Sequence, residues 1–270
     1  MNFWPGRTPL FSALLTAMIA SLVACDSGDH PAVLGGDDTD SRLGLVAQWR
    51  FEDGGGDVAT DSSELGNTAY IKDGGWGKGQ WGGGLQMNGG NDSIVIVPLS
   101  ESLRSTADAI TVMAWAYRSA EHNVAIVAHR YPELFFGFHG SQFKWAIRSE
   151  LGPWDRAARR LGFSRETRVD CYAAPEHRAL LGKWIHVAAT FDGETARLYA
   201  DGTEICSRPI AGSIRMPEAP FTISGYLDKD GAIVDEMTGT LDDVRIYNRA
   251  LSGRAIRTVY MEGAGSTLQD

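Results

Sequence analysis

From residue 45 onward the sequence consists of short apolar or alternating runs separated by Gly, Asp and Asn, and this pattern restricts the fold more than any other feature. Alternation is typical of strands, because neighbouring side chains point to opposite faces. Asp192-Gly193 and Asp201-Gly202 each lie between alternating stretches, and Asp-Gly suits the positive backbone angles of a hairpin turn. We therefore predict strands near residues 185–191, 195–200 and 203–207.

Only the end of the chain has a helical pattern. Ser252 can cap the segment "GRAIRTVYM", whose apolar residues share one helix face: Ala255, Ile256, Val259 and Tyr260. Many strands and one short terminal helix predict an all-β sandwich of two antiparallel sheets. A chain of 270 residues with 43% hydrophobic residues can bury the core of such a domain.

The first 25 residues read as an export signal. Arg7 precedes an apolar run from Leu10 to Val23, which is short for a membrane-spanning helix. The ending "LVAC" resembles the lipobox of bacterial lipoproteins, in which cleavage before the Cys is followed by lipidation of its thiol. We therefore predict a signal peptide over residues 1–24 and a lipid anchor on Cys25, in either the inner or the outer membrane. The alternative is an ordinary secretory signal.

Residues 25–44 are acidic and rich in Gly and Asp, which predicts a flexible tether after the lipidated Cys. Two further cysteines remain, Cys171 and Cys206. An exported chain with two such residues is most simply explained by one disulfide, and neither residue has the spacing of a zinc site. The chain has 25 basic and 34 acidic residues, so its net charge of -9 disfavours nucleic acid as a partner.

Several segments together resemble the laminin-G-like, concanavalin A-like lectin/glucanase superfamily. They are "WRFEDGGGDVATDSSELGN", "WGKGQWGGGLQMNGGNDSIVIV", "ITVMAWAYR", "GKWIHVAATFDGETARLYADGTEI" and "GTLDDVRIYNRALS". The resemblance places the domain at residues 45–262, followed by a tail over 263–270. It implies a jelly-roll sandwich, often with one structural calcium ion, that is used for carbohydrate or protein recognition on secreted and surface proteins. It does not imply one activity.

The adjacent carboxylates of Asp242 and Asp243 need an explanation, because like charges repel. A calcium ion takes six to eight oxygen ligands and would satisfy them. The resemblance implies that Asp242 binds this ion together with oxygens near Glu52 and Asp61, while Asp243 points to the other sheet face. The alternative is that amides of a turn satisfy Asp242 and that an arginine, Arg245 or Arg249, pairs with Asp243.

Aromatic side chains are the first candidates for sugar contacts, because the apolar edge of a sugar ring stacks on an aromatic face. The resemblance implies packing roles for Trp81 and Trp184, and the strand positions of Trp49 and Trp115 also favour the core. The predicted ligand contacts are Trp76, Arg130, Tyr131, Trp145, Trp154 and Arg156.

The segment from 148 to 182 carries seven arginines in an otherwise acidic chain. Guanidinium groups bind carboxylates and sulfates, so this insertion is either a site for an acidic glycan or a solvated loop restrained by the Cys171–Cys206 bridge.

An enzymatic function is not favoured, because the chain lacks the Glu-x-Asp-x-Glu run of laminarinase-type relatives. We therefore predict a non-catalytic recognition module for a glycan or an envelope or extracellular protein, displayed on a lipid anchor. One alternative is an acidic-polysaccharide lyase that uses His129, His139, Arg130 and Tyr131, or a hydrolase of the same fold. Another is a structural envelope protein.

Overall fold

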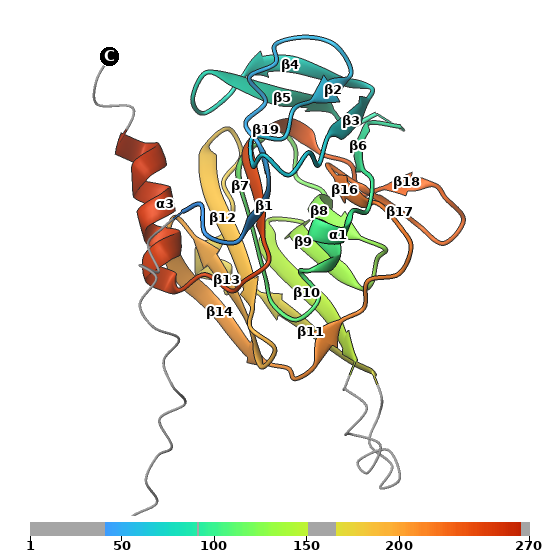
Figure 1. Cartoon of the computed structure of the whole chain (residues 1–270). Helices are drawn as coiled ribbons and strands as arrows, with labels where there is room; N and C mark the ends of the chain where they lie inside the picture. Colours follow the sequence, from blue (N-terminus) through green and yellow to red (C-terminus); the bar gives the residue numbers. More distant parts are fainter. Residues whose placement is uncertain (1–40, 91, 151–165, 266–270) are drawn as a thin grey trace, which may run out of the picture. The chain divides into compact units, whose positions relative to one another are not determined.

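The computed structural model describes residues 41–90, 92–150 and 166–265. Within these ranges two large antiparallel sheets form a sandwich, and a helix near the end of the chain packs against one of them (Figure 1). The predicted all-β sandwich is confirmed. The predicted signal peptide, Cys25, Trp154 and Arg156 lie outside the described residues. None of the helices in these ranges has the length and apolar character needed to cross a membrane.

The first sheet, which we call the helix-side sheet, contains both predicted Asp-Gly hairpins. Its strand order is β14 (Thr203–Pro209), β13 (Thr195–Ala200), β12 (Trp184–Phe191), β7 (Ile110–Arg118), β19 (Thr238–Tyr247), β5 (Gly83–Asn88) and β4 (Gly74–Lys78), and β1 (Leu45–Trp49) also pairs with β19. At the second hairpin Asp201 and Gly202 have φ angles of 47° and 73°, as a tight turn of this kind requires. The three predicted strands are therefore confirmed.

The second sheet, which we call the opposite sheet, is built mainly from the middle of the chain. Its strand order is β11 (Glu166–Tyr172), β10 (Gln142–Glu150), β9 (Leu134–His139), β8 (Val124–His129), β16 (Phe221–Ile223), β6 (Ile94–Val97), β3 (Ala69–Lys72) and β2 (Val58–Ala59), with β15 (Ser213–Ile214) paired to β10. The small elements are the β17 (Tyr226–Leu227) and β18 (Ile233–Val234) hairpin, α1 (Glu101–Arg104) and η2 (Pro175–His177).

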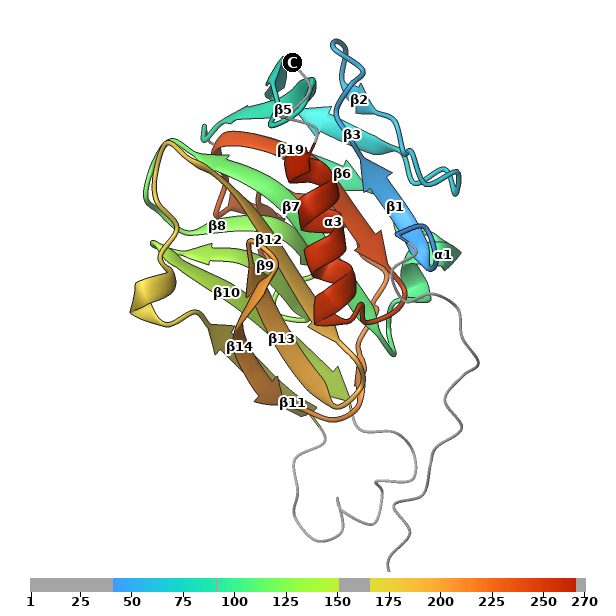
Figure 2. The ribbon, with the colours of Figure 1, turned by 90° about the vertical axis from the view of Figure 1, so that its left-hand side faces the viewer.

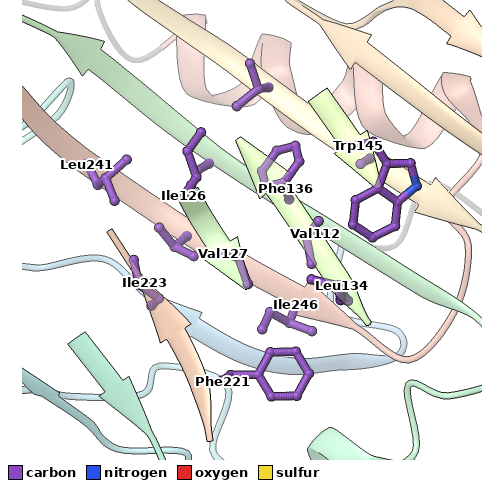
Figure 3. Close-up of a cluster of buried hydrophobic side chains, with 14 of the residues drawn as sticks. Val112, Ile126, Val127, Leu134, Phe136, Trp145, Phe221, Ile223, Leu241 and Ile246 are labelled. Atoms are coloured by element: carbon purple, nitrogen blue, oxygen red, sulfur yellow. The ribbon is translucent and has the colours of Figure 1, made fainter. Parts of the chain in front are cut away.

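Side chains from both sheets fill the space between them (Figure 3). Val112, Leu241 and Ile246 come from the helix-side sheet, and all three are fully buried. The opposite sheet contributes Phe136 and Phe221 among others. Burial of this continuous apolar surface is the main force that holds the sheets together.

A disulfide joins the two sheets at one edge. Cys171 of β11 and Cys206 of β14 are bonded, with their Cα atoms 6.0 Å apart, so the predicted pairing is confirmed. A disulfide of this kind is typical of exported proteins, because the cytosol keeps thiols reduced.

The predicted C-terminal helix is α3 (Gly253–Gly265), which lies across the helix-side sheet (Figure 2). The hydroxyl of Ser252 accepts a hydrogen bond from the backbone amide of Ala255 at 3.2 Å, as a helix cap does. Ala255, Ile256 and Val259 are buried against Met113 and Tyr199 of the sheet. This packing covers part of the outer face of the helix-side sheet.

Strand β19 contains a bulge at the two adjacent aspartates. The pairing register with β7 shifts between Asp242 and Arg245, and Asp243 has a φ angle of 46°. Leu241 and Val244 both pack in the core, so the two aspartates between them share the outer face. The prediction that Asp243 points to the other sheet face is wrong, because the bulge inserts one residue and interrupts the alternation.

Candidate functional site

The structure excludes Trp145 as a ligand contact. Its side chain is fully buried between the sheets, and its ring N–H donates to the backbone carbonyl of Thr190 at 3.2 Å. The prediction that Trp145 lies on the outer face of β10 is wrong. Because Trp145 points into the core, its neighbour Lys144 faces outward.

The remaining described candidates are divided between the two sheets. Trp76 lies on β4, at the edge of the helix-side sheet, where its ring N–H donates to the carbonyl of Gly56 at 2.8 Å and its side chain packs partly against the core. Arg130 is exposed and Tyr131 is half-buried, and both follow β8 of the opposite sheet. The structure therefore does not bring Trp76 together with Tyr131.

Tyr131 belongs to a cluster on the outer face of the opposite sheet. We call this cluster the aromatic–lysine patch, and its members are Tyr131, Phe135, Lys144, Tyr172 and Tyr226. The rings of Tyr131 and Tyr226 are 4.7 Å apart, and those of Tyr131 and Phe135 are 5.8 Å apart. The ammonium nitrogen of Lys144 lies 4.9, 5.6 and 5.8 Å from the ring centres of Phe135, Tyr172 and Tyr131. Such distances are typical of cation–π contacts.

The patch combines a buried floor with an accessible rim. Phe135 and Lys144 form the floor, with only 2% and 6% of their surfaces exposed. Tyr131 and Tyr226 are half-buried, and Tyr172 is 37% exposed. Proteins often bind a sugar with accessible aromatic faces beside a polar group. The aromatic faces contact the apolar edge of the sugar ring, and the polar group binds its hydroxyls.

Charged groups surround this floor. The guanidinium of Arg168 lies 5.5 Å from the centre of the Tyr131 ring and donates to the Tyr131 hydroxyl at 3.2 Å and to Asp170 at 3.0 Å. The same Asp170 oxygen lies 3.9 Å from the Lys144 ammonium. Burial and the nearby charge of Asp235 raise the pKa of Tyr226 to about 12, so its hydroxyl stays protonated at neutral pH.

Four members of the patch, Phe135, Lys144, Tyr172 and Tyr226, were not predicted from the sequence. A signal existed for Lys144, because the alternation in "QFKWAIR" separates Lys144 and Ala146 from Phe143 and Trp145. The pairing of Lys144 with Tyr172 across β10 and β11 depends on strand register, which one sequence does not reveal.

The predicted calcium ligands do not form one group. Asp61 accepts four hydrogen bonds, from the amides of Gln48, Ser63 and Asn67 and from the Ser63 hydroxyl, at 2.7–2.9 Å. Its carboxylate is thus satisfied without a cation. In the described parts of the chain no three His, Cys, Asp or Glu side chains are arranged to hold a metal ion. Asp61 does not fit the predicted site.

Glu52 and Asp242 fit an all-oxygen site better, because both contact the loop formed by residues 79–83. Glu52 accepts a hydrogen bond from the Gly83 amide at 2.8 Å, and Asp242 accepts one from the Trp81 amide at 3.0 Å. Glu52 makes its contact through Oε2 and Asp242 through Oδ2, and the backbone amides of Gln80 and Asp243 also act on the Asp242 carboxylate. Carboxylate oxygens are the ligands that calcium prefers.

The two adjacent aspartates have opposite electrostatic environments. Burial and the neighbouring charge of Asp243 raise the pKa of Asp242 to about 7, although backbone amides oppose this shift. Burial would also raise the pKa of Asp243, but a two-pronged ion pair with Arg245 holds it below its ordinary value. These contacts match the alternative in which turn amides bind Asp242 and an arginine pairs with Asp243.

His129 does not reach the surface. Its ring is fully buried and stacks on Phe221 at a centroid distance of 4.6 Å. Burial lowers its pKa to about 4, and the charges of Arg104 and Arg130 add to this shift. The predicted lyase role of His129 is therefore wrong, whereas His139 is exposed and its ring lies 6.0 Å from that of Tyr172.

Solved structures with the same fold include several binding domains. The binding domain of Paraclostridial Mosquitocidal Protein 1 has a TM-score of 0.61 at 16% identity; the alignment covers 81% of this chain and 52% of that one. Domain 4 of AbnA, an arabinanase from Geobacillus stearothermophilus in complex with arabinotriose, has a TM-score of 0.56 at 16% identity, over 80% of this chain and 98% of that one. The binding domain of Botulinum Neurotoxin DC in complex with SialylT has a TM-score of 0.57 at 13% identity, over 84% and 52%.

The chain thus spans about half the length of the two toxin binding domains. A search of curated proteins gave no match. A family model for the concanavalin A-like lectin/glucanases superfamily matches residues 88–257, which include most strands of both sheets. The chain therefore belongs to the concanavalin A-like lectin/glucanase superfamily.

Proposed function

We propose that the protein is a non-catalytic recognition module that binds a carbohydrate through the aromatic–lysine patch. The observation that carries this proposal is the set of accessible tyrosine rings around the largely buried Lys144 side chain on one sheet face. A sugar ring can stack on Tyr131 or Tyr226 while its hydroxyls bind the polar groups beside them. The arabinanase domain in complex with arabinotriose, which shares the fold, is one similar structure that binds a carbohydrate.

A glycan array followed by calorimetry tests this function. Tyr131→Ala and Tyr226→Ala should each weaken binding about tenfold or more, because truncation of a central aromatic contact removes much of the binding energy. Tyr70→Ala is the matched control: Tyr70 is 51% exposed on β3 of the same sheet but lies outside the patch. Equal losses in all three variants would contradict the proposal, as would an array without any bound glycan. A protein ligand would then be sought by cross-linking.

An acidic-polysaccharide lyase is the second candidate, and the position of exposed His139 beside Tyr172 favours it. Proton abstraction from a uronate needs a base and a neighbouring acid within reach of the sugar. The lyase would release unsaturated sugar products, and His139→Ala would abolish them while leaving glycan binding in place. Absence of such products from a panel of uronate polymers would remove this candidate.

We also propose the lipid anchor that the sequence predicts at Cys25. The disulfide is consistent with export, which such an anchor requires. Mass spectrometry of the N-terminal peptide should find an acylated Cys25, and Cys25→Ser should release the protein from membranes. An unmodified N-terminus in membrane fractions would contradict the anchor.

Calcium binding is a further proposal, now restricted to Glu52 and Asp242. Their contacts with one glycine-rich loop support it, and a bound cation would offset the cost of burying the Asp242 charge. Such an ion would have a structural role, because it would lie on the helix-side sheet rather than at the aromatic–lysine patch.

A further inference from the structure

The ammonium group of Lys144 lacks a hydrogen-bond acceptor among the described residues. Its side chain is only 8% exposed, and its nearest carboxylate, that of Asp170, is 3.9 Å away, which is beyond hydrogen-bond distance. Three aromatic rings surround it and stabilise its charge, but they do not replace an oxygen acceptor. The ammonium nitrogen is not among the fully buried unpaired polar atoms of the described residues, so it is open to a ligand that supplies an oxygen acceptor.

Asp170, the carboxylate nearest to the Lys144 ammonium, is shared between two cations. Asp170 accepts a hydrogen bond from Arg168 at 3.0 Å, and the same oxygen is the closest acidic group to Lys144. Lys144 and Arg168 thus place two positive charges beside Asp170, and Asp235 adds a second negative charge to the patch when it is ionised.

Asp235 and Asp228 are further acidic groups near Tyr226 of the patch, and His139 and His122 lie near Asp235. Burial raises the pKa of Asp235, although the charges of Lys144, His139 and His122 act in the opposite direction. Its side chain makes no hydrogen bond among the described residues. An anionic ligand would raise this pKa further, so Asp235 should oppose such a ligand while ionised.

We infer that the aromatic–lysine patch selects a sugar acid, whose carboxylate binds Lys144 while its ring stacks on Tyr131 or Tyr226. This inference rests on the proposed function, because it names the class of carbohydrate that the same patch binds. Uronates and sialates share this chemistry: a carboxylate attached directly to a pyranose ring. The charge-assisted hydrogen bond to the Lys144 ammonium provides the selectivity.

The test compares each acid with its neutral methyl ester on the purified full chain. The probes are an oligogalacturonate and a sialyllactose, each measured by calorimetry beside its carboxyl methyl ester. The wild type should bind at least one acid about tenfold more tightly than its ester. The probe that shows this preference identifies the source of the carboxylate as a uronate or a sialate.

Lys144→Met removes the charge and keeps most of the side-chain volume. It should reduce binding of the acid to the level of the ester and leave binding of the ester unchanged. Lys229→Met is the matched control, because Lys229 is an exposed lysine beside the β17–β18 hairpin with a side chain 83% exposed. Thermal unfolding of each variant confirms that the domain is folded.

Asp235→Asn provides an independent test in the opposite direction. It removes a negative charge that faces the patch, so it should strengthen binding of the acid severalfold and leave the ester unaffected. Weaker binding of the acid would overturn the inference, because it would mean that Asp235 and Lys144 together hold the hydroxyls of a neutral sugar.

The two proposals fail in different ways. If acid and ester bind equally and Tyr131→Ala weakens both, the selection of an acid is wrong and the carbohydrate function stands. If the wild type binds neither probes nor any glycan on the array, the proposed function is wrong and the inference fails with it.

Discussion

The two outer faces of the sandwich differ in what covers their outward-pointing side chains. On the helix-side sheet, α3 covers the outward residues, and Trp115 is only 5% exposed between Trp81 and Tyr260. On the opposite sheet, tyrosines of the patch keep part of their rings accessible. Aromatic residues on an outer face are therefore candidates for ligand contacts only where the chain does not cover them itself.

Histidines on the two faces differ in the same way. His186 is fully buried beside Trp115 and Tyr260, and burial lowers its pKa to about 3. His139 is exposed on the face that carries the patch. The comparison predicts that stability depends on residues of the covered face and that binding depends on residues of the exposed one.

The largest expected effect is on the covered face. Trp115→Ala should lower the free energy of unfolding by about 3–5 kcal/mol, because it leaves a cavity between the sheet and α3. Tyr172→Ala, on the exposed face, should lower it by less than about 1 kcal/mol. Urea unfolding measures both, and similar losses would remove the distinction between the faces.

The link between the sheets comes next. Replacing both Cys171 and Cys206 with alanine should lower the free energy of unfolding by about 2–4 kcal/mol, because the bond restricts the unfolded chain. Reduction of the wild type should produce the same loss in urea unfolding. A domain as stable without the bond as with it would show that packing alone holds this edge.

Calcium should act on the helix-side sheet alone. A hundredfold excess over the dissociation constant should stabilise the wild type by about 2.7 kcal/mol in thermal unfolding, and a chelator should reverse the shift. Asp242→Asn should abolish this response, whereas Asp170→Asn on the opposite sheet should retain it. A response that survives in Asp242→Asn would place the ion elsewhere.

Lowering the pH should destabilise the domain through His186 but not through His139. The pKa of His186 is about 3 in the folded domain, against 6.5 for an ordinary histidine, so the unfolded chain binds the proton more tightly. The contribution of His186 is therefore complete above pH 6.5 and decreases as the pH falls, by about 2 kcal/mol at pH 5. His186→Gln should reduce this acid sensitivity, measured by urea unfolding at each pH. His139→Gln should behave as the wild type does.

Local chemistry was enough to predict much of the fold. The Asp-Gly pairs place the β12–β13 and β13–β14 turns, and the cap and apolar face of α3 follow from Ser252 and the residues after it. The disulfide follows from the number of cysteines in a chain predicted to be exported. Each of these features depends on residues that are close in sequence or few in number.

The candidate site was harder to predict, because its members come from separate segments. Tyr131 was identified, but Trp145 was assigned to the wrong face of β10, and the ring of Tyr226 comes from a hairpin almost a hundred residues away in sequence. The bulge at Asp243 likewise depends on pairing between β19 and its neighbours.

The sequence by itself determined the strands, the hairpin turns, the terminal helix and the class of fold, because backbone propensity and alternation act over a few residues. Only the tertiary structure decided which outer face α3 covers and which residues surround Lys144. These outcomes depend on strand register, and a shift of one residue exchanges the buried and exposed sides of a whole strand.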